Sequence, residues 1–339
     1  MSVDLSALTR LGGRLAAKRR FGSVATVAMA IALIAVGGAL ALLPKSALHL
    51  RPVPAAAEAA APAVPADPQL PELRRIMGSY GPVVTQEVSQ DDGRLSVVLG
   101  HPYQRADVDT LAGDIGSAVT AVTQLWGTDW ARAAVVAVAS SPAEFAALTH
   151  ATGNVSDQVS AASVSDPFVP GARPTGQRVV FSADAGRRLG ADGLRDTLRH
   201  ELTHVAARAV TVDGSPLWTL EGFAEYSAHR GENRTFAQLA PVLTADARAG
   251  ELPAELPPDS AFAPGPANDA TLAYEAGWSA NAFVADQYGQ HTVVELYRRM
   301  ATGPKDGPAV DAALHDTLGL NQADFVTRWR EWIKSRAGA

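Results

Sequence analysis

Residues 200–204 read His-Glu-Leu-Thr-His, and they constrain this chain more than any other stretch. They lie in a segment that is predicted to be helical over about residues 192–209. Side chains four positions apart lie on the same face of a helix, one turn from each other. The imidazoles of His200 and His204 would therefore lie side by side, where they could hold one zinc ion. Glu201 could reach a water on that ion as a general base without being a ligand.

The rest of this helix favours that interpretation. An apolar stripe recurs at helical spacing and consists of Leu194, Leu198, Leu202 and Val205. The two histidines fall on a different side of the helix from the stripe, so the leucines can be buried while both imidazoles point into a cleft. The alternative is a pair of solvated surface histidines, and the residues downstream weigh against it.

Composition excludes several other kinds of site. The chain has 339 residues and no cysteine, so neither a disulfide framework nor a thiolate metal site is possible. Its net charge of −6 is unevenly distributed: the residues up to Arg51 include seven basic and one acidic residue, and the remainder has 22 basic and 34 acidic residues. Because phosphate binding needs a basic surface, the acidic remainder argues against nucleic acid as a partner.

The N-terminal part has the pattern of a membrane anchor. Residues 1–23 are basic and are expected to stay in the cytoplasm, and residues 24–43 form an uncharged apolar run long enough to span a bilayer. Residues 44–72 are rich in alanine and proline and predict an extended linker. The domain, residues 73–336, would then lie outside the cell membrane, with the membrane as a partner through the single span. Cleavage after the apolar run is the alternative, and a buried core helix fits the basic flank less well.

The globular part predicts an α+β fold. Apolar runs bounded by turn residues predict strands at 82–88, 95–99, 133–139, 159–164 and 178–182. A helix is expected at 108–125, and another is expected to begin after Ser141, where Ser-Pro-Ala-Glu forms a helix start. A mixed sheet would thus precede the metal-binding helix, and mostly helical structure would follow it.

A catalytic zinc needs a third protein ligand and one open position. Residues 217–226 read Leu-Trp-Thr-Leu-Glu-Gly-Phe-Ala-Glu-Tyr. An H-E-x-x-H pentad followed by such a helix resembles the gluzincin metallopeptidases, and most of all the bacterial peptidase-MA-like domains, which are related to the M1 aminopeptidases. The resemblance implies a thermolysin-like zincin fold, one Zn²⁺ per chain and Glu221 as third ligand. Glu221 follows His204 by 17 positions, slightly fewer than in the M1 enzymes.

A second glutamate, Glu225, lies one helical turn beyond Glu221 on the same face. It could accept from the free ring N–H of a ligand histidine, which would fix the orientation of that ring. It could also be the third ligand in place of Glu221, or a carboxylate on the helix surface.

Residues 274–278 read Tyr-Glu-Ala-Gly-Trp and are expected to open a helix that runs to Gly289. By the same resemblance, Tyr274 would donate to the oxygen on which negative charge develops, and it would be catalytic together with Glu201. The alternative is a tyrosine packed where two parts of the domain meet.

Two weaker expectations concern the substrate side. The strand at 178–182 could be the edge strand on which an extended peptide is laid. The remaining histidines show no ligand spacing and are treated as surface or core residues, namely His49, His101, His150, His229, His291 and His315.

The sequence thus favours a membrane-anchored zinc metallopeptidase whose zinc is bound by His200, His204 and Glu221, with a peptide or protein as substrate. A catalytically silent binding or scaffold module of the same fold is the alternative, and a zinc hydrolase of non-peptide amides is a third. In the M1 enzymes that the chain resembles, a G-x-M-E-N motif binds the free amine of the substrate. No such motif is present in this sequence, so the resemblance does not support aminopeptidase activity. The choice between endopeptidase and exopeptidase action and the oligomeric state are left open.

Overall fold

The computed structural model describes residues 67–339 except 153–155, 157, 170 and 264–266. The predicted anchor at 24–43, the basic segment before it and most of the linker lie outside the described residues. Within the described part of the chain, no helix combines the length and the apolar character that a membrane span requires. The anchor and the placement of the domain outside the membrane therefore stay predictions.

One five-stranded sheet forms the first half of the described chain, with the strand order β1-β2-β3-β5-β4. The strands are β1 (Val84–Ser89), β2 (Leu95–Gly100), β3 (Val135–Val138), β4 (Ala161–Val164) and β5 (Arg178–Phe181). The β2–β3 and β3–β5 pairs are parallel, and the two outer pairs, β1–β2 and β4–β5, are antiparallel. The sheet is mixed, which confirms the α+β part of the predicted fold.

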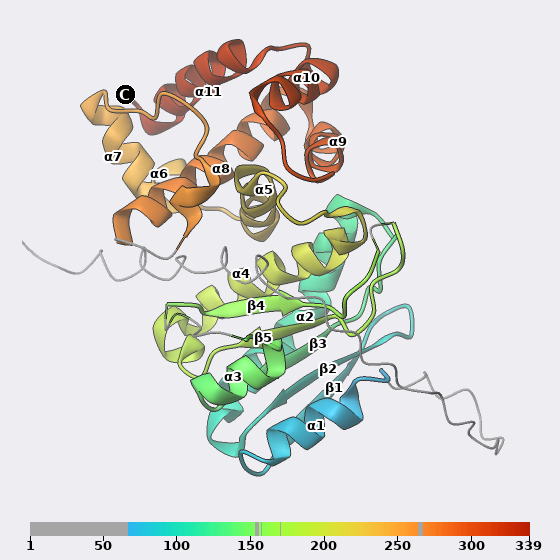
Figure 1. Ribbon diagram of the computed structural model, residues 1–339. Helices are drawn as coiled ribbons and strands as arrows, with labels where there is room; N and C mark the ends of the chain where they lie inside the picture. Colours follow the sequence, from blue (N-terminus) through green and yellow to red (C-terminus); the bar gives the residue numbers. More distant parts are fainter. Residues whose placement is uncertain (1–66, 153–155, 157, 170, 264–266) are drawn as a thin grey trace, which may run out of the picture.

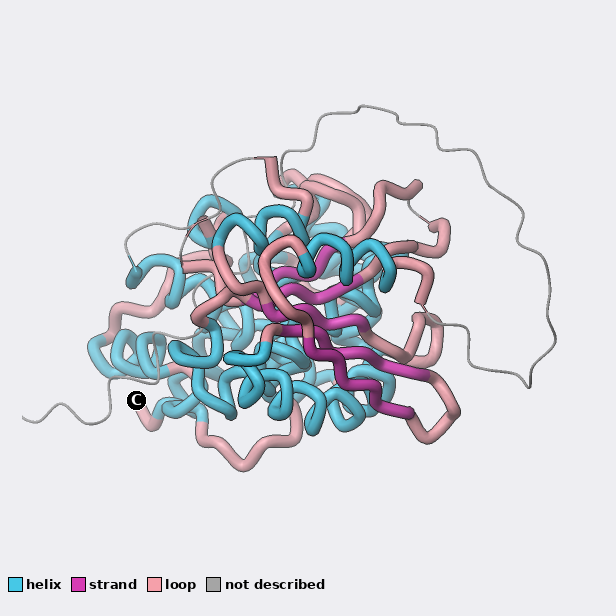
Figure 2. Tube along the Cα trace, turned by 90° about the horizontal axis from the view of Figure 1, so that it is seen from below, coloured by secondary structure: helices cyan, strands magenta, loops and turns pink. Residues whose placement is uncertain are grey.

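Helices cover both faces of this sheet (Figures 1 and 2). One face carries α1 (Leu70–Gly78) and α3 (Pro142–Thr149), and the other carries α2 (Arg105–Trp126) and α4 (Ala185–Ala207). Successive strand residues point to opposite faces. Accordingly, Val97 and Leu99 of β2 pack with α1 and α3, whereas Val98 between them packs with α2 and α4. Burial on both faces explains why the inner strands are continuous apolar runs.

Two helix starts show how far local signals reach. The Ser141 hydroxyl accepts a hydrogen bond from the Glu144 backbone N–H at 3.2 Å, which confirms the predicted start of α3. By contrast, α1 begins at Leu70, three residues before the expected start of the globular part at residue 73. Leu70 is buried, so the end of the Ala/Pro-rich stretch already belongs to the folded domain.

The second half is helical among its described residues (Figure 1). Its α-helices are α5 (Leu217–His229), α6 (Phe236–Leu239), α7 (Pro241–Ala249), α8 (Ala267–Tyr288), α9 (Gln290–Met300), α10 (Gly307–Leu318) and α11 (Gln322–Ala337). Short 3₁₀ turns are η2 (Pro102–Gln104), η3 (Arg208–Val210) and η4 (Asp259–Phe262). In Figure 1, α5 lies between α4 and the other helices of this half, so it joins the two halves.

The position of α5 is fixed by close packing against α8. A Cβ atom built on Gly222 would lie 2.3 Å from the Gly277 carbonyl oxygen, so only glycine fits at residue 222. Beside this contact, the Asn281 side chain donates to the Gly277 carbonyl at 2.9 Å. The glycine that follows Glu221 is therefore explained by helix packing, which sets where α5 presents its glutamates.

Two expectations about elements are wrong. The strand at 178–182 is not an edge strand, because β5 lies between β3 and β4, and the free edge beside it belongs to β4. Strand order depends on pairing between distant segments, which the local pattern does not show. Also, Tyr274 does not open its helix, because α8 begins at Ala267 and the tyrosine lies two turns further on.

Candidate metal centre

The centre is built first on α4. The backbone of Gly190 (φ 66°, ψ −178°) breaks the helix, so its regular part begins close to the predicted residue 192. The apolar stripe at Leu194, Leu198 and Leu202 is buried in the core shared with the sheet. The opposite side turns His200 and His204 toward α5, and their rings lie 4.8 Å apart between centroids.

The third donor comes from α5, which packs along α4. Glu221 lies in the second turn of α5, next to the glycine that contacts α8. It is buried, and its Oε2 atom lies 3.3 Å from His200 Nε2 and 3.5 Å from His204 Nε2. The two Nε2 atoms are 3.1 Å from each other.

These three distances fit a zinc ion. Ligand atoms at about 2.0–2.1 Å from a tetrahedral zinc lie about 3.3 Å from one another. The three donor atoms of His200, His204 and Glu221 are separated by 3.1–3.5 Å. Three protein ligands also leave a fourth position for water or substrate, as in catalytic zinc sites.

Buried polar atoms around this point lack the partners that such atoms normally have. Both carboxylate oxygens of Glu201 and Oε2 of Glu221 are buried without a hydrogen-bond partner among the described residues. Glu201 is 0% exposed and directly follows His200. A bound cation and its water would satisfy these atoms, so the residues present fit the metal.

The pKa shifts show that the site favours positive charge. Burial lowers the pKa of His200, but Glu225 and Glu221 outweigh it and raise that pKa well above its usual value. Burial raises the pKa of Glu221, but His204 and His200 outweigh it and lower the pKa to about 2. Burial is also the main reason why the pKa of Glu201 is raised. A divalent cation would supply the positive charge that this site stabilises.

Glu225 lies on the far side of His200 from the three donor atoms. Its Oε1 is 3.0 Å from His200 Nδ1, the ring nitrogen that does not face Glu221. Its Oε2 is 3.2 Å from Nε2 of His229, the last residue of α5. Glu225 thus faces the other ring nitrogen of His200, whereas Glu221 is the glutamate whose oxygen lies beside both Nε2 atoms.

His229 is a residue of this site that sequence reasoning missed. It was treated as a surface or core histidine because it has no ligand spacing with other histidines. The available signal was its distance from Glu225, four positions along the same helix. Burial lowers the pKa of His229, but Glu225 and Glu232 outweigh it and raise the pKa to about 9.

Tyr274 is buried in α8, and its ring packs edge-on against Phe262 of η4, with ring centroids 5.2 Å apart. This packing agrees with the alternative of a tyrosine at the meeting of two segments. A catalytic role for Tyr274 therefore stays a prediction.

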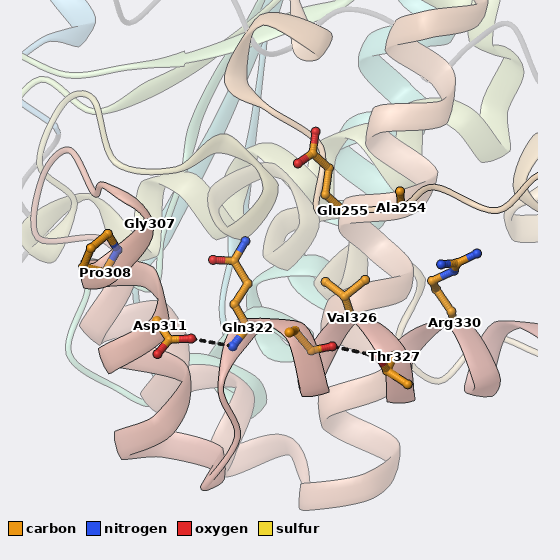
Figure 3. A pocket seen from close by; sticks show the side chains of 10 residues that line it. Ala254, Glu255, Gly307, Pro308, Asp311, Gln322, Val326, Thr327 and Arg330 are labelled. Atoms are coloured by element: carbon orange, nitrogen blue, oxygen red, sulfur yellow. Dashed lines mark hydrogen bonds between the residues drawn. The ribbon is translucent and has the colours of Figure 1, made fainter.

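A surface hollow of about 790 Å³ lies elsewhere, in the helical half (Figure 3). Its lining comes from residues 254–255 and from α10 and α11, where the Gln322 backbone N–H donates to Asp311 at 2.7 Å. None of the predicted site residues lines this hollow.

Comparison with known proteins gives matches among solved structures only. No family model and no curated protein matches the chain. The chain has 15% identity and a TM-score of 0.41 to a variant of a two-domain M1 zinc metallopeptidase bound to L-arginine. It has 16% identity and a TM-score of 0.43 to a variant of an M1 zinc metallopeptidase from Deinococcus radiodurans bound to a Tyr-Ser-Ala substrate.

Both matches cover 76% of this chain, and the chain spans about half the length of those structures, 52% and 53%.

Proposed function

We propose that this chain is a zinc-dependent metallopeptidase, held at the outer face of a membrane by residues 24–43. The observation that carries the proposal is the set of three donor atoms, from His200, His204 and Glu221, at mutual distances of 3.1–3.5 Å. Glu201 lies buried beside them without a hydrogen-bond partner among the described residues. A metal group with an adjacent carboxylate is the arrangement that hydrolysis by an activated water requires.

Each residue has a defined part in this proposal. His200, His204 and Glu221 hold the metal, and Glu225 orients the ring of His200. When bound, zinc polarises the substrate carbonyl and lowers the pKa of a water to about 7. Glu201 takes the proton from the attacking water and passes it to the leaving amine.

The direct test uses the full-length chain in a membrane fraction and a mixture of unmodified and end-blocked peptides. We expect about one zinc per chain and peptide hydrolysis that a chelator abolishes and added zinc restores. Cleavage of end-blocked peptides would identify an endopeptidase. Stoichiometric zinc without cleavage of any peptide would favour the silent binding module instead, and a folded chain that takes up no zinc would exclude both the metal site and the enzyme.

Tyr274 is proposed to donate its hydroxyl to the substrate carbonyl oxygen as negative charge develops there. We expect Tyr274→Phe to lower kcat by about 100-fold, the size seen for loss of one such donor, with zinc content and thermal stability close to those of the wild type. A Phe262→Leu variant is the matched control, because Phe262 packs against the Tyr274 ring without a polar group. Equal loss of activity in both variants would mean that Tyr274 acts only through packing.

A further inference from the structure

The metal centre is one end of a longer array of histidine and carboxylate side chains. The helices α4 and α5 each carry three such side chains at four-residue spacing. These side chains face one another in three pairs, an inner pair His204–Glu221, a middle pair His200–Glu225 and an outer pair Asp196–His229. Because residue numbers fall along α4 as they rise along α5, the two helices run antiparallel through these contacts. The inner and middle pairs make up the site described above, and the outer pair has no part in it so far.

The outer pair is largely buried and connected to the middle pair. His229 is 6% exposed, and its Nε2 lies 3.2 Å from Glu225 Oε2. Its Nδ1 is 3.3 Å from Glu232 Oε2 and 4.0 Å from Asp196 Oδ2. The His229 ring therefore lies between the carboxylate that contacts His200 and two carboxylates nearer the surface.

The oxygens of Asp196 and Glu232 and Nδ1 of His229 lie close enough together to resemble a second metal site. The position that a cation would take is, however, filled by Arg234. Its Nη2 lies 2.7 Å from Asp196 Oδ2 and 2.8 Å from His229 Nδ1, and it also forms an ion pair with Glu232. The guanidinium closes this end of the array and holds the outer pair in place.

We propose that His229, held by Asp196, Glu232 and Arg234, is a positioning residue that fixes Glu225 and through it the metal-binding ring of His200. This inference rests on the metal site proposed above. Nothing in it requires the outer group to bind a metal itself.

The physical reason lies in the two oxygens of Glu225. One oxygen contacts His200 and the other contacts His229, and the side chain is only 7% exposed. Without His229, one oxygen of a buried carboxylate would lose its polar partner, which is strongly unfavourable. The carboxylate would then be free to rotate, and the His200 ring would lose a fixed polar neighbour. Loss of such a neighbour typically weakens metal binding by about 10- to 100-fold.

The test compares His229→Met with His229→Gln in the full-length chain. Methionine fills a similar volume without a polar N–H, whereas the glutamine amide can donate at nearly the place of His229 Nε2. Zinc affinity is measured by competition with a chelator, and the visible spectrum of the Co²⁺-loaded protein reports the geometry at the ion. The matched control is His101→Met, because His101 is also buried against a carboxylate, 3.0 Å from Glu144, but beside α3 on the other face of the sheet.

We expect His229→Met to weaken zinc binding by about 10-fold and to change the Co²⁺ spectrum, and His229→Gln to stay within about threefold of the wild type. His101→Met should lower the melting temperature and leave zinc affinity unchanged. If His229→Met does not fold, Arg234→Gln at the more exposed outer end takes its place, with a smaller loss of affinity in the same direction.

Two results would overturn the inference while the proposed function stands, and in both the wild type binds zinc tightly. In the first, a folded His229→Met or Arg234→Gln variant binds zinc as tightly as the wild type. In the second, His101→Met loses as much zinc affinity as His229→Met. A wild type that binds no zinc would overturn the proposed function, and this inference with it.

Discussion

A Glu201→Gln variant of the full-length chain is expected to keep its zinc and to lose about 100- to 10,000-fold in kcat, the range that a general acid–base residue contributes. Glutamine has nearly the same shape as glutamate but cannot take a proton from water. Glu201 does not belong to the three residues that could hold the metal, so its replacement keeps the donor atoms of His200, His204 and Glu221. The measurement is kcat on the best peptide of the wild type, together with zinc per chain by elemental analysis.

The control for this prediction is Glu144→Gln, the same change at an equally buried glutamate. Glu144 is 0% exposed and accepts from the Ser140 backbone N–H at 2.6 Å, far from the metal helix on the other face of the sheet. We expect this variant to be less stable but equally active. If Glu201→Gln with full zinc retained more than about a tenth of the wild-type kcat, another group would have to be the base.

Several regular elements of the first half could be predicted because each of them carries its own local signal. The leucine stripe of α4 is buried as its spacing predicts, and the Ser141 cap starts α3 where the sequence places it. The short apolar runs that predict strands at 95–99, 133–139 and 178–182 contain the buried strands β2, β3 and β5. In these cases the position of the apolar residues along the segment directly determines which of its sides is buried.

Strand order could not be predicted in this way. β5 enters between β3 and β4, although β4 comes before it in the sequence. Ala161 pairs with Phe181 across about twenty residues of chain, and no local feature of either strand specifies that contact. The wrong choice of edge strand follows from this: only β5 is buried along its whole length, but the short runs of β4 and β5 do not reveal in sequence which of them is the inner strand.

The site shows the same division between local and distant information. Both histidines and Glu201 lie within one short motif, so their proximity follows from the helix alone. Glu221, Glu225 and His229 follow one another at four-residue spacing, but His229 has no such spacing to another histidine, so the sequence does not mark it as part of a metal site. The packing of α5 against α4 is needed to show that these three residues face Asp196, His200 and His204.

Replacing Glu221 or Glu225 by alanine should separate the two roles of these glutamates by a large difference in zinc affinity. Glu221→Ala removes one of three ligands, and we expect no stoichiometric zinc after dialysis against a chelator. Glu225→Ala removes an orienting carboxylate, and we expect a loss of about 10- to 100-fold, with zinc still bound when the metal is in excess. Chelator competition measures both losses on one scale.

The difference follows from which ring nitrogen each glutamate meets. Glu221 Oε2 lies 3.3 Å from His200 Nε2, on the side where His204 Nε2 also lies, whereas Glu225 Oε1 lies 3.0 Å from His200 Nδ1 on the other side of the ring. A neutral imidazole that binds the metal through Nε2 carries its proton on Nδ1, and Glu225 Oε1 is the carboxylate oxygen at ion-pair distance from that nitrogen. A greater loss of zinc in Glu225→Ala than in Glu221→Ala would require the ring to bind through Nδ1 and would move the metal to the other side of His200.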